Sequence, residues 1–520
     1  MDFKATKTVK TLGWFFVLIS IVYTFYASFS QRGLFLDGSY YMMYLLDNIS
    51  NNDFSVFISI LRPRAAVEWL QQFPTVFLGI VLGIKSKLTL STIFSLTLFL
   101  TPLLALFWNY QLTKRTKEYG ILFWSIFTYC IMILLYQIFA LVETIIGIPF
   151  QFVLLNYLFG KINYTKFDKI GIAFLILLMF GIYEHTVLLG VIMFAGTFLA
   201  VFDEENPKNM FVKVCIGAGS IAASFYTAFF MILTPNERSE GIRFLKEWID
   251  FWPYALNLNI ILSLLSVFLI VILLFKNKTL NKKVTAFISF IYLFVFLKMI
   301  NHLGYFLDPM REMHMRSIVC WAVPLIFFGI VLFKYKNKKL VDTQNKEIIS
   351  NEKLNIITNN AYIPVLLCGI TLTGWQIVHT YYWNQNISYM KKELANCSDI
   401  LYIPHEHEEI SSFFNNDLRR YIWKSNYPST ALMYDENYKI QKFLMVLDYS
   451  EETEGDIPRR ENLYSVIEKG VISIPYNYRA QIVNKFWDLT DVAVALEKYN
   501  NDNDIQTNKS EYLEELQQQQ

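Results

Sequence analysis

The chain has 520 residues, of which 54% are hydrophobic and only 17% are charged, a balance typical of proteins whose main solvent is lipid. The formal net charge is +2 and the charges lie in loops, which argues against a nucleic-acid-binding protein. Most cysteines lie in apolar runs, so their spacing predicts neither a disulfide framework nor a zinc site.

Apolar runs of spanning length recur along the chain. The first, 11–29, follows three lysines, and we interpret it as an uncleaved span rather than a signal peptide. The run 170–202 would be roughly 50 Å long as one helix, against about 30 Å of hydrocarbon, so we predict two short spans that meet at Tyr183-Glu184-His185. The segment 73–84 is too short to cross alone. The other runs are 88–112, 119–141, 144–160, 211–233, 254–275, 284–301, 317–333 and 361–382.

Positive charge predicts the orientation, because short cytoplasmic loops collect Lys and Arg. If 73–84 does not cross and 170–202 crosses twice, eleven spans result, and every basic cluster lies on the side of the N-terminus. We therefore predict a multi-pass protein of a bacterial inner membrane with a cytoplasmic N-terminus and an extracytoplasmic C-terminus. The clusters are Lys114-Arg115-Lys117, Lys161/Lys166/Lys169, Lys276/Lys278/Lys282/Lys283 and Lys334/Lys336/Lys338/Lys339.

The predicted fold is an all-α polytopic membrane domain of about 11 transmembrane helices over 1–382, followed by a small α/β extracytoplasmic domain over 383–520 with a disordered tail. The main external loops of the membrane domain are 30–87, 234–253 and 302–316. The polar stretch 334–360 is typical of a flexible linker. In the C-terminal domain, strand-like runs occur at 400–403, 443–447 and 471–474.

The first external loop holds a candidate catalytic acid. Asp37 follows the first span by a few residues and precedes Tyr40 and Tyr41, with Arg62 and Arg64 further along the loop. A carboxylate at the lipid interface is suitably placed to act as general base on the head group of a membrane-anchored substrate. The alternative is that Asp37 caps a helix that starts near Ser39, because Asp is a favoured N-cap residue.

Other ionisable residues lie beside predicted helix ends. Glu143 closes the run 119–141 at a tight hairpin, and a charge deeper in the hydrocarbon would cost about 2.5–3.5 kcal/mol. Glu184 and His185 are flanked by long apolar runs, and the alternative to a functional role is that they mark an interfacial turn.

Loop 302–316 is rich in ionisable side chains. The planar guanidinium of arginine can form two parallel hydrogen bonds to a phosphate. Candidates for binding a lipid phosphate are therefore Arg311 and Arg316, together with His302 and His314. The alternative is that these side chains snorkel at the start of a helix.

The order of these features resembles the GT-C superfamily of membrane glycosyltransferases, in particular the protein O-mannosyltransferase and lipid A aminoarabinose transferase type. In that family one span leads to a loop with a catalytic acid, then to a proline-led membrane-parallel helix, then to a span that ends in basic residues. Asp37, the stretch from Pro74 to Gly83 and the run 88–112 ending in Lys114-Arg115 follow this order. The resemblance covers most of 1–335 as an arrangement of features.

Two further positions carry the resemblance. Glu143 looks like the second loop acid of such enzymes, and Arg316 followed by Pro324 looks like their late loop arginine. Many members carry a second acid directly after the first, whereas this chain has Gly38 there, so no cofactor is assigned and a divalent metal stays open.

The resemblance implies transfer of a sugar, with inversion, from a polyprenyl-phosphate donor to a glycan, lipid or protein acceptor outside the cytoplasm. Asp37 would be the base and Glu143 would orient a substrate. Arg311 and Arg316, assisted by His302 or His314, would stabilise the leaving phosphate. The remaining candidates for substrate binding are Tyr40, Tyr41, Arg62, Arg64, Glu184 and His185, although an interfacial aromatic belt also explains the tyrosines.

Other classes of protein share some of these features. A lipid-linked glycan flippase or transporter would also need many spans, but it would carry charges within them and show repeat symmetry. A glycan polymerase or ligase usually relies on a large late external loop. A scaffold whose working part is 383–520 is a third alternative.

Overall fold

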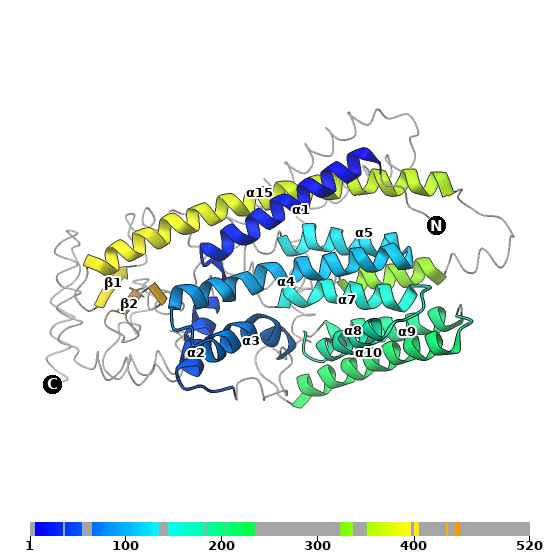
Figure 1. Cartoon of the computed structure of the whole chain (residues 1–520), viewed down its shortest axis with the longest axis horizontal. Helices are drawn as coiled ribbons and strands as arrows, with labels where there is room; N and C mark the ends of the chain where they lie inside the picture. The colour runs from blue at the N-terminus through cyan, green and yellow to red at the C-terminus, as the bar shows by residue number, and fades with distance from the viewer. Residues whose placement is uncertain are drawn as a thin grey trace, which may run out of the picture. The chain divides into compact units, whose positions relative to one another are not determined.

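The computed structural model describes residues 6–34, 37–54, 65–134, 144–182, 185–202, 204–233, 323–335, 351–396, 400–404, 433–434 and 443–447. These residues are almost entirely helical (Figure 1). The chain divides into two compact units. Unit 1 comprises Met1–Phe29, Phe54–Leu78 and Thr92–His379, and unit 2 comprises Ser30–Asp53, Gly79–Ser91 and Thr380–Gln520.

Four described helices are long and apolar enough to cross a membrane. They contain the predicted runs 11–29, 88–112, 211–233 and 361–382. The first three are α1 (Lys7–Phe29), α4 (Lys87–Thr116) and α10 (Pro207–Leu233), and the fourth is the stretch Asn359–Gln385 of α15 (Asn351–Asn396). Four such helices are compatible with a membrane protein, and the predicted runs 254–275 and 284–301 lie outside the described residues.

Shorter apolar helices account for the other described runs. The run 119–141 begins with α5 (Tyr119–Thr128), which continues into the π-helical turn η3 (Tyr129–Ile133). Residues 144–160 form α7 (Thr144–Phe159), and the run 317–333 overlaps the helix Val323–Tyr335.

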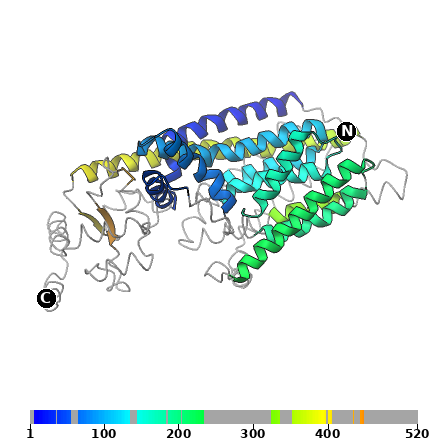
Figure 2. The ribbon, with the colours of Figure 1, turned by 60° about the horizontal axis from the view of Figure 1, so that its bottom comes forward.

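The predicted break in 170–202 is confirmed. The run forms two helices, α8 (Lys166–Met179) and α9 (Thr186–Phe202), and the predicted meeting point 183–185 falls between their bounds in the sequence. Helices α8 and α9 both pack against α10, and all three lie side by side in Figures 1 and 2. Close approach of α9 to α10 depends on small residues, because a Cβ at Gly190 would collide with the carbonyl oxygen of Ser220 and one at Gly217 with the side chain of Thr197.

Two expectations about helix boundaries are wrong. The membrane-parallel helix was predicted to start at Pro74, but α3 (Ala65–Val81) has Pro74 in its interior, so the helix starts nine residues earlier. The stretch 334–360 was predicted to be a linker, but α15 begins at Asn351. In its third turn, Asn359 Oδ1 accepts a hydrogen bond from the Thr6 amide at 2.8 Å.

Polar contacts join the basic segments at one end of unit 1, which we call the basic end. Lys334 Nζ lies 2.6 Å from Glu118 Oε2 at the start of α5, and Arg115 Nη1 lies 2.8 Å from Asp168 Oδ1 on α8. Tyr362 on α15 donates a hydrogen bond to the Tyr119 carbonyl at 3.0 Å, so this part of α15 lies at the basic end. Asn359 is one turn away on the same helix and contacts Thr6, so the N-terminal residues lie at that end too. The basic end therefore brings together segments that carry three of the four predicted basic clusters, and the fourth cluster, 276–283, lies outside the described residues.

Unit 2 holds the segment that follows α1. It contains the 3-10 turn η1 (Arg32–Leu34) and α2 (Asp37–Ser50). It also contains a parallel pair of strands, β1 (Ile400–Pro404) and β2 (Phe443–Leu447), in which Ile400 faces Phe443. Two of the strands expected in the C-terminal domain are thus present, and the third expected strand lies outside the described residues.

Candidate functional site

The predicted catalytic acid occupies the start of a helix. Asp37 is the first residue of α2, which also contains Tyr40 and Tyr41. The side chain of Tyr41 is half-buried, and the side chains of Asp37 and Tyr40 lie outside the described residues. The position fits both sequence interpretations of Asp37, a general base and a helix-capping residue, so a functional test is needed to separate them.

Most other predicted site residues lie outside the described part of the chain. Their grouping with Asp37 in one composite site therefore stays a prediction. These residues are Arg62, Arg64, Glu143, Glu184, His302, Arg311, His314 and Arg316.

His185 is the predicted site residue whose surroundings the structure shows in most detail. Its side chain is buried in the turn before α9, and its Nε2 lies 3.0 Å from Gln151 Oε1 on α7. Burial lowers the pKa of His185 to about 4, so the imidazole is neutral near pH 7. A neutral imidazole can donate and accept one hydrogen bond each, but it carries no positive charge that would attract a phosphate.

The segment between α1 and α2 is firmly anchored within unit 2. The Arg32 guanidinium is only 1% exposed, and its Nη1 donates a hydrogen bond to Thr380 Oγ1 at 2.8 Å. The Trp383 indole donates to the Ser30 carbonyl at 2.9 Å, and Asn384 Nδ2 donates to Ser30 Oγ at 2.8 Å. The last part of α15 thereby holds the residues that lead into Asp37.

The turn after α1 has a backbone that suits this anchoring. Gln31 adopts a left-handed conformation with φ 54°, which ends the helix as a C-terminal cap residue does. The Leu34 amide donates to the Gln31 carbonyl at 3.0 Å and closes the turn η1. The helix α1 thus ends in a hydrogen-bonded turn directly before the segment that leads to Asp37.

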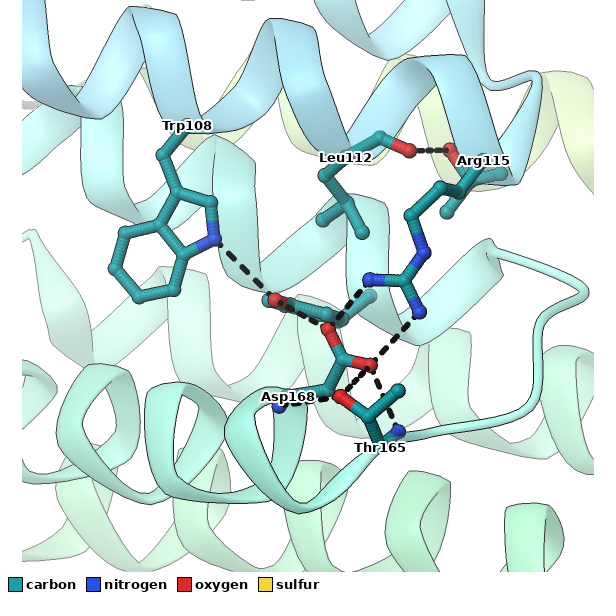
Figure 3. Close-up of polar contacts among 7 residues, drawn as sticks. Trp108, Leu112, Arg115, Thr165 and Asp168 are labelled. Atoms are coloured by element: carbon teal, nitrogen blue, oxygen red, sulfur yellow. Dashed lines mark hydrogen bonds and ion pairs between the residues drawn. The ribbon is translucent and has the colours of Figure 1, made fainter.

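A bidentate ion pair lies at the basic end, where α4 meets α8. Figure 3 shows the Arg115 guanidinium facing the Asp168 carboxylate, with both Nη1–Oδ1 and Nη2–Oδ2 distances at 2.8 Å. Thr165 and Asp168 also form a capping box at the start of α8. Tyr157 donates to Asp168 Oδ1 at 3.1 Å and accepts a hydrogen bond from the Trp108 indole at 3.2 Å.

These contacts fix the charge of Asp168. Burial alone would raise the pKa of its carboxyl, but the hydrogen bonds from Arg115 and Thr165 outweigh burial and hold the pKa well below its ordinary value. Since every partner named is a protein group and Asp168 is an ion-paired carboxylate, this cluster is suited to fastening helices together and not to proton transfer.

A second polar cluster joins α4 to α7. Asn156 on α7 donates through Nδ2 to Asn109 Oδ1 and to Thr113 Oγ1, each at 2.7 Å. Its Oδ1 accepts a hydrogen bond from Thr116 at 2.7 Å. All four side chains are buried, so a buried polar network joins α4 and α7.

Replacing Asp168 with Asn should destabilise the protein. The substitution removes the ion pair with Arg115 and leaves a neutral amide among donors that need an acceptor, so we expect a loss of about 1–3 kcal/mol. Thermal unfolding of the purified chain measures this loss, and an unchanged melting temperature would contradict the stabilising role of Asp168.

The stabilisation by Asp168 also depends on pH. Because the pKa of Asp168 is depressed in the folded state, its contribution to the free energy of unfolding is present above the unfolded-state pKa of about 3.9 and is lost as pH falls below that value.

Nothing in the described residues indicates a metal centre, since they contain no group of three or more His, Cys, Asp or Glu side chains that could hold an ion. Comparison with known proteins found no matching family model, no matching curated protein and no matching solved structure.

Proposed function

We propose that this chain is a membrane glycosyltransferase that moves a sugar, with inversion, from a polyprenyl-phosphate donor to an extracytoplasmic glycan, lipid or protein acceptor. The observation that carries the proposal is the position of Asp37. It begins α2 shortly after the first candidate span, in a segment anchored through Arg32 and Trp383. A base must be held at a fixed position to accept a proton during attack, and an anchored segment meets that requirement.

In the proposed reaction the acceptor hydroxyl attacks the anomeric carbon of the donor sugar. Its proton passes to the Asp37 carboxylate as the new glycosidic bond forms. The bond between the anomeric carbon and the phosphate oxygen breaks, and the polyprenyl phosphate leaves with the bonding electrons. Charge grows on that phosphate, so Arg311 and Arg316, with His302 or His314 assisting, stabilise the transition state more than the ground state. Glu143 orients one of the sugars.

The proposed topology has eleven spans, with the basic end in the cytoplasm. The gathering of Thr6, Arg115 and Lys334 at one end of unit 1 supports it, because basic residues collect on the cytoplasmic side. Asp37 follows the other end of α1 and is therefore extracytoplasmic in this topology.

A reporter fusion tests this topology. Alkaline phosphatase is active only after export, so its fusion after residue 400 should be active, and fusion within the turn at Lys117 should be inactive. Green fluorescent protein at the same positions should give the opposite pattern. An inactive phosphatase and a fluorescent protein after residue 400 would contradict an extracytoplasmic C-terminal region.

The proposed activity is tested directly with the purified full chain in lipid nanodiscs. Donors are polyprenyl phosphates that carry a radiolabelled hexose, pentose or amino sugar, and acceptors are extracts of envelope glycan, lipid or protein. Label should move to an acceptor with inversion at the anomeric carbon and release of polyprenyl phosphate. Movement of intact donor across the bilayer without cleavage would instead identify a flippase.

A further inference from the structure

Helix α3 carries an aromatic stripe on an exposed face. Trp69, Phe73 and Phe77 are spaced four residues apart, so they lie one above another along the helix. The Trp69 and Phe73 rings stack with centroids 6.0 Å apart, and the Phe73 and Phe77 centroids are 5.6 Å apart. Trp69 is 44% exposed and Phe77 is 42% exposed, which suits contact with lipid.

The opposite face of α3 is polar and buried. Gln71, Gln72 and Thr75 share this face, and their exposures are 3%, 2% and 0%. In the part of the chain that the structure describes, Gln71 Oε1, Gln72 Nε2 and Thr75 Oγ1 have no hydrogen-bond partner. Buried polar atoms in proteins are nearly always paired, so three such atoms on one helical face require a reason.

Contact with α4 keeps this face from turning outward. Thr97 Oγ1 lies 2.8 Å from the Gln71 carbonyl oxygen and 2.8 Å from the Phe94 carbonyl oxygen on its own helix. The backbone of α3 is therefore fastened at Gln71, and the aromatic stripe faces away from the polar face.

We propose that Gln71, Gln72 and Thr75 bind the hydroxyl groups of a lipid-linked sugar. The inference rests on the proposed function and deepens it by assigning a sugar-binding face. Amide and hydroxyl groups donate and accept hydrogen bonds without carrying charge, which matches neutral polyhydroxylated ligands better than phosphate. The aromatic stripe keeps α3 at the lipid boundary, where the sugar of a polyprenyl-phosphate donor would lie.

The experiment uses Gln72→Leu and Thr75→Val in the full chain in nanodiscs. If the polar atoms serve a ligand, apolar replacements of similar shape should raise the melting temperature of the ligand-free protein by about 1–3 °C. The same variants should bind a short-chain polyprenyl-phosphate hexose about 5–10-fold more weakly, as expected for a lost hydrogen bond. Binding of the bare polyprenyl phosphate should stay unchanged.

Matched controls are available in α15, where buried residues of the same types are paired. Gln376 Nε2 donates to the Leu134 carbonyl at 2.7 Å, and Thr373 Oγ1 donates to the Gly369 carbonyl at 2.7 Å. Gln376→Leu should lower the melting temperature, and Thr373→Val should not raise it. Neither control should alter the preference for the sugar-bearing lipid over the bare lipid.

A lower melting temperature in both Gln72→Leu and Thr75→Val would overturn the proposal, because the polar face would then be structural. An unchanged preference for the sugar-bearing lipid would overturn it equally. If free maltose competes for binding at this face, and the protein binds the sugar-bearing lipid and the bare lipid equally well, the face binds the acceptor. That result would overturn the proposal of a donor site. If no donor supports transfer but both expected shifts occur, the sugar-binding face stands and only the proposed reaction fails.

Discussion

Replacing Asp37 by Asn should abolish sugar transfer while the protein still folds. A positioned general base contributes typically 10²–10⁴-fold to a rate, so we expect a loss of about that size. The substitution also separates the two interpretations of Asp37. Asn caps a helix about as well as Asp, so a capping role would survive the change, whereas a base would be lost. Radiolabel transfer from a polyprenyl-phosphate sugar measures the effect.

The matched control for this variant is Asp53→Asn, which changes an acid shortly after the end of α2. Both variants should be expressed at the wild-type level and should melt at a similar temperature. Asp53→Asn should keep its transfer activity. Full activity in Asp37→Asn would reduce Asp37 to a helix-terminal residue and remove the catalytic role assigned to it.

Replacing Arg32 by Ala should have the largest effect on stability. The substitution removes a fully buried guanidinium that donates to Thr380, and it leaves a cavity beside the anchored segment. We expect a loss of about 2–4 kcal/mol, together with reduced sugar transfer because Asp37 follows this segment. Thermal unfolding in nanodiscs and the transfer assay measure the two effects.

Two milder variants define what Arg32 contributes. Arg32→Lys keeps the charge but lacks the planar guanidinium, so it should recover part of the lost stability. Thr380→Val removes only the acceptor and should cost about 1 kcal/mol. If Arg32→Ala melts at the wild-type temperature, the anchoring role of Arg32 is wrong.

Sequence reasoning worked best where length and hydropathy decide the structure. The run 170–202 is too long for one span, and the polar pair Glu184-His185 near its middle predicted the break between α8 and α9. Sequence reasoning failed where the packing of a helix overrides the local structural preference of one residue. The resemblance to GT-C enzymes placed Pro74 at the start of a helix, yet α3 carries Pro74 in its interior.

The anchoring contacts of the candidate site were beyond sequence reasoning for a different reason. Arg32 and Thr380 are 348 residues apart, and Ser30 and Trp383 are 353 apart, so no local pattern connects them. The Arg115–Asp168 pair had a partial signal. Thr165 three residues before Asp168 is the spacing of a capping box, which predicts the start of α8, but the arginine partner lies 53 residues away.

The most direct test is a structure of the full chain with a polyprenyl-phosphate sugar bound in a lipid nanodisc. We expect the Asp37 carboxylate to lie within hydrogen-bond reach of the acceptor position beside the anomeric carbon, with Arg316 on the phosphate and Glu143 in the same site. A lipid phosphate bound far from Asp37, or an Asp37 carboxylate that only caps α2, would contradict it.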